Sequence, residues 1–472
     1  MTVKPKTILE NGDGLFNTHV TVEDLEEVIQ DQMKTNSKLG KNTKYTVIGE
    51  GNIVSRSQKL SQSQSSQFPK SNCSSSNSFL RHFQGIMSRI ILVEPQWTIS
   101  DDHLPSKFVL KIPYCVHIQG LIGQMIAMNP MSEEQEAGLW AMWESEIQSI
   151  HNREVNINKI VEKWNKREDL LNPRVYFSKK YDSENRNKGF IGMEYAEDSI
   201  VRHLYVNVKP RELYPVSVKL FLLFVLKFVA HFQASGLHLT DEEKQSISGF
   251  DIEKIAGPLM SEDGIKGILQ QVRMMNPEKF DEKVKKIEAF GMEIVNFELA
   301  SNLNKYVGID QPVLVHGDLW ATNVLWKEKK EEWIVSKIID YQGIHMGNPA
   351  EDLVRLFVST LSGPDRQKYW EKLLEKFYKF FLEALQSQNA PYSLEQLKES
   401  YRCYFVFGGV GLVQLMGPVT QRKLTMCSPD ENVEEYQKVV LGKMEHLLDD
   451  VEKFHLHSRN VTKSYKKPVT RI

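Results

Sequence analysis

The sequence predicts an α+β chain folded into two lobes: a small one built on an antiparallel sheet, and a larger one that is mainly helical. Two observations support this prediction. The chain has 472 residues, more than a single hydrophobic core usually serves. Segments that read as strands concentrate in the first 200 residues, whereas apolar residues in most of the remaining chain recur at helical spacing.

The predicted small lobe contains helices and strands in alternation. Thr21 and Asp24 form a capping-box pattern that opens a helix ending near Met33. Segments rich in β-branched and aliphatic residues predict strands, followed by a long helix over residues 132–168 and a hairpin with a polar turn. The strands are expected over residues 44–51, 88–97, 106–113, 174–181 and 189–196.

The rest of the chain is predicted to be helical apart from one hairpin, formed by residues 324–326 and 333–340. A last helix is expected to start at Ser428, with Pro429 in its first turn, and to run to about Phe454. These patterns divide the chain into an N-terminal helical extension, a small sheet-based lobe, a helical lobe and a loose basic tail. The corresponding ranges are 1–43, 44–198, 199–456 and 457–472.

Composition narrows the expected partners. The formal net charge is -2, which gives no reason to expect nucleic acid or an anionic membrane as the main partner. No segment is apolar over the length of a bilayer span, because residues 220–230 form too short a run and include Lys227. The four cysteines form no C-x-x-C pair and no disulfide framework, so a reducing, cytoplasmic location is expected. Composition does not predict the oligomeric state.

The most informative segment is "HGDLWATN", which continues into a hairpin that ends in "IIDYQ". Transfer of a phosphoryl group from ATP to a hydroxyl needs a carboxylate that orients the acceptor, together with magnesium and a lysine on the phosphates. Asp318 can be that carboxylate. Asn323 and Asp340 can supply the hard oxygen ligands that magnesium prefers. The sequence therefore predicts ATP and Mg²⁺ as cofactors.

These two motifs, in this order, resemble the aminoglycoside phosphotransferase and choline kinase superfamily, and more narrowly its CHK kinase-like group, which includes ecdysteroid kinase-like proteins. The resemblance covers roughly residues 48–446. It implies a protein kinase-like fold in which Asp318 is the catalytic base and Asn323 and Asp340 bind magnesium. It also implies that His316 props the loop and that Asp352, in "NPAEDL", braces it.

The small lobe offers counterparts for the remaining parts of such a site. Lys111 lies on an apolar strand and matches the phosphate-binding lysine; we expect Glu154 as its partner, with Glu146 as the alternative. The segment "IGEG" resembles a glycine loop over the phosphates. The segment "GFIGMEYAED" resembles the hinge that faces adenine. These two segments add the nucleotide-binding candidates Gly49, Gly51, Glu194, Tyr195 and Ala196.

The resulting expectation is an enzyme that transfers phosphate from ATP to a hydroxyl of a small molecule. Only about ten residues separate Asp340 from the next predicted helix, too few for the activation segment of a protein kinase. The acceptor is expected to bind among the helices after Asp198, and sterol-like, choline-like and xenobiotic alcohols all remain open. Two alternatives also remain: an inactive ATP-binding pseudokinase or scaffold, and a protein kinase.

One segment departs from this pattern. Residues 54–84 contain 11 serines in 31 residues and no acidic residue, which predicts disorder. They would separate two strands that should form a tight hairpin over the phosphates. Val54-Ser55 can be encoded by GTAAGT and Phe83-Gln84 by TTTCAG, the two ends of a common intron, and the intervening length keeps the reading frame. A translated intron and a serine-rich regulatory flap are both compatible with the sequence.

Overall fold

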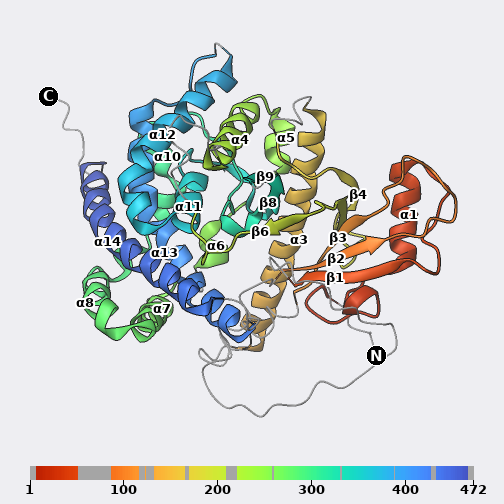
Figure 1. The fold of residues 1–472 in the computed structure, drawn as a ribbon, viewed down its shortest axis with the longest axis horizontal. Coiled ribbons are helices and arrows are strands. Elements are labelled where there is room, and N and C mark those ends of the chain that lie inside the picture. Colours follow the sequence, from red (N-terminus) through yellow and green to blue (C-terminus); the bar gives the residue numbers. More distant parts are fainter. Residues whose placement is uncertain are drawn as a thin grey trace. The chain divides into compact units, whose positions relative to one another are not determined.

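The computed structural model describes residues 7–50, 87–115, 123, 132–164, 170–208, 221–257, 260–329, 332–386, 388–426 and 432–465. The chain forms two compact units. One comprises Met1–Trp164 with Pro173–Glu197, and the other comprises Asn165–Asn172 with Asp198–Ile472. The larger sheet belongs to the first unit and most helices to the second (Figure 1). The predicted two-lobed α+β architecture is confirmed.

The first unit is built on a five-stranded sheet whose order is β1-β2-β3-β5-β4. Every neighbouring pair in it is antiparallel, as predicted. Its strands are β1 (Lys44–Glu50), β2 (Ser88–Glu94), β3 (Phe108–Pro113), β4 (Val175–Lys179) and β5 (Phe190–Glu194).

Two helices pack in the first unit, and capping boxes open both. In α1 (Val22–Met33) the cap is Thr21 with Asp24, and in α3 (Glu133–Lys163) it is Ser132 with Gln135. A short 3-10 turn, η1 (Leu15–Asn17), precedes α1. The apolar face of α1 joins the hydrophobic core of the sheet, where Leu25 and Ile29 are fully buried. This packing makes the N-terminal helix an integral part of the unit.

The second unit contains two small sheets. One has the order β6-β8-β9 and includes the hairpin that the sequence predicts. The other pairs β7 with β10 and carries the motif segments at its ends. The strands are β6 (Ser199–Val201), β7 (Val313–Val315), β8 (Val324–Lys329), β9 (Glu332–Ile338) and β10 (His345–Gly347), and the 3-10 turns next to them are η5 (Ala321–Asn323) and η6 (Tyr341–Gly343).

Helices make up most of the second unit. The apolar segment near residue 225 forms α4, which is buried as predicted. No helix in the described ranges has both the length and the apolar character that crossing a bilayer requires. The helical elements are α4 (Phe221–Gly236), α5 (Asp241–Ser246), α6 (Ile252–Ala256), α7 (Glu262–Met275), α8 (Pro277–Glu288), η4 (Gly291–Ile294), α9 (Phe297–Ser301), α10 (Leu303–Tyr306), α11 (Glu351–Thr360), α12 (Gly363–Leu385), α13 (Leu394–Met426) and α14 (Val433–Tyr465).

The C-terminal end differs from the prediction. Helix α14 continues to Tyr465, so residues 457–465 are helical rather than part of a loose tail. The reason is packing: Ser458 is buried, and Arg459 forms an ion pair with Glu293 of η4. The predicted helix start at Ser428 and the serine-rich segment 54–84 lie outside the described residues.

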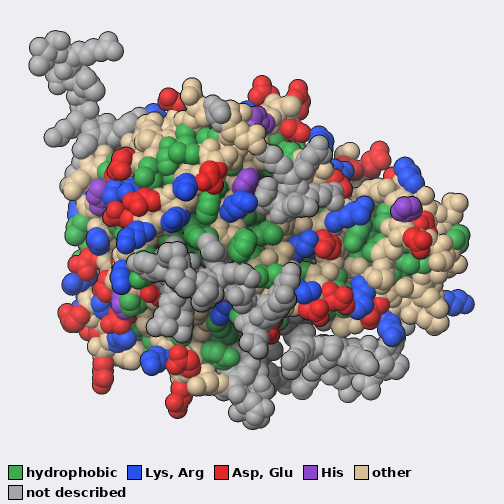
Figure 2. Space-filling model, turned by 45° about the horizontal axis from the view of Figure 1, so that its top comes forward, with side chains coloured by type: hydrophobic (Ala, Val, Ile, Leu, Met, Phe, Trp, Pro, Cys, Tyr) green, Lys and Arg blue, Asp and Glu red, His purple; other side chains and the backbone are tan. Residues whose placement is uncertain are grey.

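Charged side chains of both signs are interspersed over the face that Figure 2 shows, without a large region of one sign. This distribution accords with the small net charge of the sequence. Large single-sign surfaces are what usually concentrate polyanionic partners. The face in view therefore adds no support for nucleic acid as a partner.

Candidate active site

A buried lysine and glutamate pair in the sheet unit. Lys111 lies on β3, and its Nζ is 2.7 Å and 2.8 Å from the two carboxylate oxygens of Glu154 on α3. The two side chains are only 6% and 2% exposed. Glu146, the alternative partner, instead accepts a hydrogen bond from Arg153 at 3.4 Å. The structure thus brings Lys111 and Glu154 together and leaves Glu146 with a different cation.

The other nucleotide-binding candidates lie at the ends of strands in the same unit. Gly49 is opposite Ile90, at the point where the register between β1 and β2 shifts, and Gly51 lies outside the described residues. Glu194 is the last residue of β5, and its backbone N–H donates a hydrogen bond to the carbonyl oxygen of Arg174 at 2.7 Å. Its carboxylate accepts from the Arg174 N–H at 3.0 Å. Both hydrogen bonds therefore connect Glu194 with the residue just before β4 and stabilise the sheet. The role of Glu194 at an adenine-facing hinge stays a prediction.

In the helical unit, a buried aspartate anchors the loop of the "HGD" motif by hydrogen bonds to its backbone. Asp352, in the first turn of α11, accepts hydrogen bonds from the backbone N–H groups of His316 at 2.8 Å and Gly317 at 2.9 Å. Burial raises the pKa of Asp352 to about 6, and these two hydrogen bonds oppose that rise. Gly317 has a φ of +78°, and a side chain there would overlap the carbonyl oxygen of Gly343. The loop therefore needs glycine between His316 and Asp318.

His316 links the two motifs. Its ring is fully buried, and Nδ1 accepts the backbone N–H of Asp318 at 3.3 Å. The opposite nitrogen, Nε2, lies 3.1 Å from the carbonyl oxygen of Ile339, to which it donates when Nδ1 is the acceptor. The imidazole thus connects the "HGD" segment with the residue just before Asp340. This geometry suits the propping role that the resemblance implies.

Asp318 itself has two side-chain partners. One carboxylate oxygen lies 3.2 Å from the Arg355 guanidinium, and the other accepts from the Asn323 amide at 3.0 Å. Burial raises the pKa of Asp318 to about 7; Arg355 opposes the rise, and the Asp340 carboxylate adds to it. The side chain nevertheless keeps 35% of its surface exposed. A carboxylate that is held in place and still accessible can accept a proton from a bound hydroxyl.

Asn323 and Asp340 carry oxygen atoms of the kind that a magnesium ion would need. The Asn323 amide nitrogen donates to the carbonyl and carboxylate of Asp318, whereas its buried Oδ1 has no hydrogen-bond partner in the part of the chain that the structure describes. Such an oxygen is costly unless a ligand satisfies it. Asp340 follows Ile339, whose N–H donates to the Asn323 carbonyl at 3.0 Å. Its left-handed backbone, with φ +71°, is the kind of local strain found at functional sites. Both residues offer hard oxygen donors.

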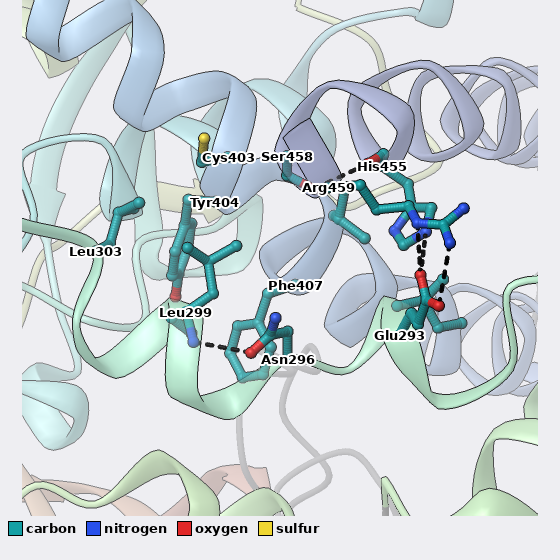
Figure 3. A pocket seen from close by; sticks show the side chains of 13 residues that line it. Glu293, Asn296, Leu299, Leu303, Cys403, Tyr404, Phe407, His455, Ser458 and Arg459 are labelled. Carbon is teal, nitrogen blue, oxygen red and sulfur yellow. Dashed lines mark hydrogen bonds and ion pairs between the residues drawn. The ribbon is translucent and has the colours of Figure 1, made fainter. Parts of the chain in front are cut away.

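A cavity of about 420 Å³ opens among the helices of the second unit. Figure 3 shows apolar side chains, among them Leu299 and Phe407, on one side and the ion pair of Glu293 with Arg459 on the other. Tyr404 also lines the cavity; burial raises the pKa of its hydroxyl, and the nearby Arg355 guanidinium opposes that rise. Arg355 therefore acts electrostatically on this wall of the cavity and also contacts Asp318.

Sequence reasoning missed Arg355 and Tyr404. Arg355 is three residues after Asp352 on α11, so the two side chains share one face of the helix. That spacing could have identified Arg355, because a cationic side chain one helical turn after Asp352 can reach the same loop. Tyr404 gives no such signal, because only the packing of α13 against α11 brings it near.

Known proteins resemble this chain over different lengths. The DUF1679 family model, described as "Uncharacterized oxidoreductase dhs-27", matches residues 8–57 and 70–459. "Uncharacterized kinase-like protein D1044.1" of Caenorhabditis elegans is 33% identical over 95 residues, 20% of this chain and 24% of that protein. "Uncharacterized oxidoreductase dhs-27" of the same organism is 23% identical over 337 residues, 68% of this chain and 37% of that protein. This chain thus spans well under half the length of either relative.

Among solved structures, choline kinase from Cryptosporidium parvum Iowa II is similar to this chain, with a TM-score of 0.38 and 13% identity. The similarity covers 82% of this chain and 90% of that one.

Proposed function

We propose that this chain, which belongs to the DUF1679 family, is an ATP- and magnesium-dependent phosphotransferase acting on a small-molecule hydroxyl. The family match and the kinase-like relative together confirm the predicted resemblance to the CHK kinase-like group. The observation that carries the proposal is the buried Asn323 amide. Its nitrogen is fixed by Asp318, and its oxygen has no partner within the described ranges. A carboxylate and an unsatisfied amide oxygen, held together in one loop, suit a base beside a metal ligand.

Each residue then has a distinct task. Asp318 orients the acceptor hydroxyl and takes its proton, while Arg355 favours the ionised form that a base requires. Asn323 and Asp340 would hold magnesium, which when bound neutralises charge on the phosphate oxygens. Lys111, kept in place by Glu154, would bind the nucleotide phosphates. His316 and Asp352 position the loop without touching the reacting atoms.

The 420 Å³ cavity is our candidate for the acceptor pocket. Its size suits a small molecule, and its mixed lining suits a ligand with both an apolar body and polar groups. Arg355, which influences Tyr404 in the cavity wall and contacts Asp318, links the cavity electrostatically with the loop that carries Asp318. Filling it with Leu299→Trp should lower turnover of the acceptor while leaving ATP binding unchanged.

The name "oxidoreductase" comes from one relative, of which this chain covers only 37%, and the DUF1679 family model carries the name of that same relative. Dinucleotide-dependent dehydrogenases of the doubly wound type bind their cofactor on a parallel sheet. In the described part of this chain, every paired strand is antiparallel. This observation favours the phosphotransferase over a dehydrogenase of that type.

Nucleotide binding tests the proposal without knowledge of the acceptor. ATP affinity should be measured by calorimetry with excess Mg²⁺ and again with a chelator. We expect Mg²⁺ to strengthen binding to the wild type, and Asn323→Leu and Asp340→Asn to lose that gain. Lys111→Met should weaken binding under both conditions. Asp365→Asn, in the N-terminal turn of α12, is the control. An undiminished Mg²⁺ effect in both loop variants would contradict the metal assignment.

A further inference from the structure

A second group of potential metal ligands lies away from the motif loop, between helices α13 and α14. Glu399 and Cys403 are four residues apart, so their side chains project from the same face of α13. His457 reaches them from α14. One ligand atom from each of the three residues lies within 4.8 Å of the other two.

The three side chains already converge on one point. Glu399 Oε1 lies 2.7 Å from His457 Nε2 and 3.8 Å from the Cys403 sulfur. Tetrahedral zinc, with bonds of about 2.0–2.3 Å, holds its ligand atoms roughly 3.3–3.7 Å apart. These two separations bracket that range, and the ligand atoms of Cys403 and His457 lie within 4.8 Å of each other, so small shifts of the side chains would accommodate a cation. The other oxygen of Glu399 lies 3.0 Å from Arg402, an interaction that fixes the carboxylate and directs Oε1 toward the pair.

We propose that Glu399, Cys403 and His457 form a binding site for a borderline-soft divalent cation, zinc above all, which joins helices α13 and α14. On binding, the Cys403 thiol gives its proton to solvent and ligates as the thiolate. His457 Nε2 likewise ligates in its unprotonated form, in place of its present hydrogen bond with Glu399. No oxidation or reduction is involved. Three protein ligands leave the fourth position to water, as in open zinc sites.

Ligand chemistry selects against magnesium here. A thiolate and an imidazole favour zinc, whereas magnesium prefers oxygen donors alone. Access is available on two sides: His457 keeps 41% of its side chain exposed, and Cys403 lines the 420 Å³ cavity (Figure 3). The site therefore differs in its residues and in its ligand chemistry from the loop that carries Asn323 and Asp340.

Cobalt(II) titration of the full chain tests the site, because Co²⁺ replaces zinc and absorbs characteristically when a thiolate binds it. The titration should be done in excess Mg²⁺, which saturates magnesium sites. We expect one Co²⁺ per chain, a sulfur-to-cobalt charge-transfer band, and bleaching of that band by one equivalent of Zn²⁺. Cys403→Ala should abolish the band, and His457→Gln should weaken Co²⁺ binding at least about tenfold.

Two variants serve as matched controls. Cys115→Ala removes the other described buried cysteine, and His446→Gln removes another histidine of α14. Both should keep the band and the affinity, and far-ultraviolet circular dichroism should show that every variant is folded. The proposal is wrong if the wild type shows no thiolate band in the presence of Co²⁺. It is equally wrong if the band survives in folded Cys403→Ala protein.

Discussion

At the scale of single residues, the Lys111–Glu154 ion pair offers the clearest test of whether a buried pair has a functional role in addition to a structural one. Helix α3 carries two buried glutamates, each paired with a buried cation: Glu154 with Lys111 and Glu146 with Arg153. Both pairs lie in the same unit, and only one of them includes the proposed phosphate-binding lysine. The chain thus provides its own control for the effect of breaking a buried ion pair.

We predict that Glu154→Gln and Glu146→Gln both destabilise the protein, by about 3–5 kcal/mol each, because each removes the negative charge beside a buried cation. Only Glu154→Gln should also weaken ATP binding, since it frees Lys111 to move. Denaturant unfolding gives the first quantity and calorimetry gives the second. Equal ATP affinity in the two variants would show that the Lys111 pair is purely structural.

Much of the residue-level site follows from the sequence, because its parts are close in the chain or belong to recognisable motifs. Asn323 is five residues after Asp318, and the loop between them folds back so that the two side chains meet. Glu154, the expected partner of Lys111, pairs with it although 43 residues separate the two along the chain. Arg355 was missed, although its spacing from Asp352 offered a clue, and Tyr404 could not be found, because its position depends on helix packing.

At the scale of secondary structure, local signals predicted the elements well and their ends less well. The capping boxes at Thr21 and Ser132 mark the starts of α1 and α3, because those hydrogen bonds form within four residues. Strand β6 was not predicted, since three residues carry too little pattern and its pairing with β8 is long-range. The extension of α14 past Phe454 depends on contacts with η4, which no local pattern reports.

The segment between β10 and α11 provides a pH-dependent contribution to stability. His345, at the start of β10, lies 3.2 Å from Glu351 on α11 and 2.7 Å from the carbonyl of Gly343. Burial alone would lower the pKa of His345, but the Glu351 carboxylate and the Gly343 carbonyl outweigh it, so the net pKa lies above its ordinary value. The charged imidazolium therefore stabilises the folded state.

We predict that the free-energy difference between the wild type and His345→Gln depends on pH. An unfolded histidine titrates near pH 6.5. The stabilisation is complete below that pH and is lost as the pH rises through the higher pKa of the folded state. Urea unfolding of both proteins between pH 5.5 and 9 measures it. The stacking of Phe250 on the His345 ring contributes to the free energy of unfolding at every pH, so it does not affect how the difference between the two proteins changes with pH. A difference that stays constant, or grows with pH, would refute the ion-pair account.

At the scale of the whole molecule, the main question is whether the native protein contains the serine-rich segment. The two ranges matched by the family model omit residues 58–69, inside the segment 54–84 that the sequence singles out. We predict that mature messenger RNA lacks the corresponding codons and that a chain without residues 54–84 folds and binds ATP at least as well as the full chain. A transcript that contains them, together with peptides from the segment in the purified protein, would support the regulatory flap instead.

The residues proposed to carry the activity are divided between the two units. Lys111 and Glu154 come from the sheet unit, and Asp318, Asn323 and Asp340 come from the helical unit. A pseudokinase or scaffold would still bind nucleotide, so binding alone does not distinguish it from an enzyme. A protein kinase would turn over ATP with a protein acceptor instead of a small alcohol. Turnover with a defined acceptor is therefore the decisive observation.

The most direct measurement is ATP consumption by the wild type and by Asp318→Asn across a library of small alcohols, with detection of the phosphorylated product. We predict that at least one alcohol is phosphorylated by the wild type in a magnesium-dependent reaction. Asp318→Asn should keep ATP binding and lose turnover by about 10²–10⁴-fold, the usual contribution of a general base. Near-normal turnover of the same alcohol by Asp318→Asn would contradict the assignment of Asp318 and the mechanism built on it.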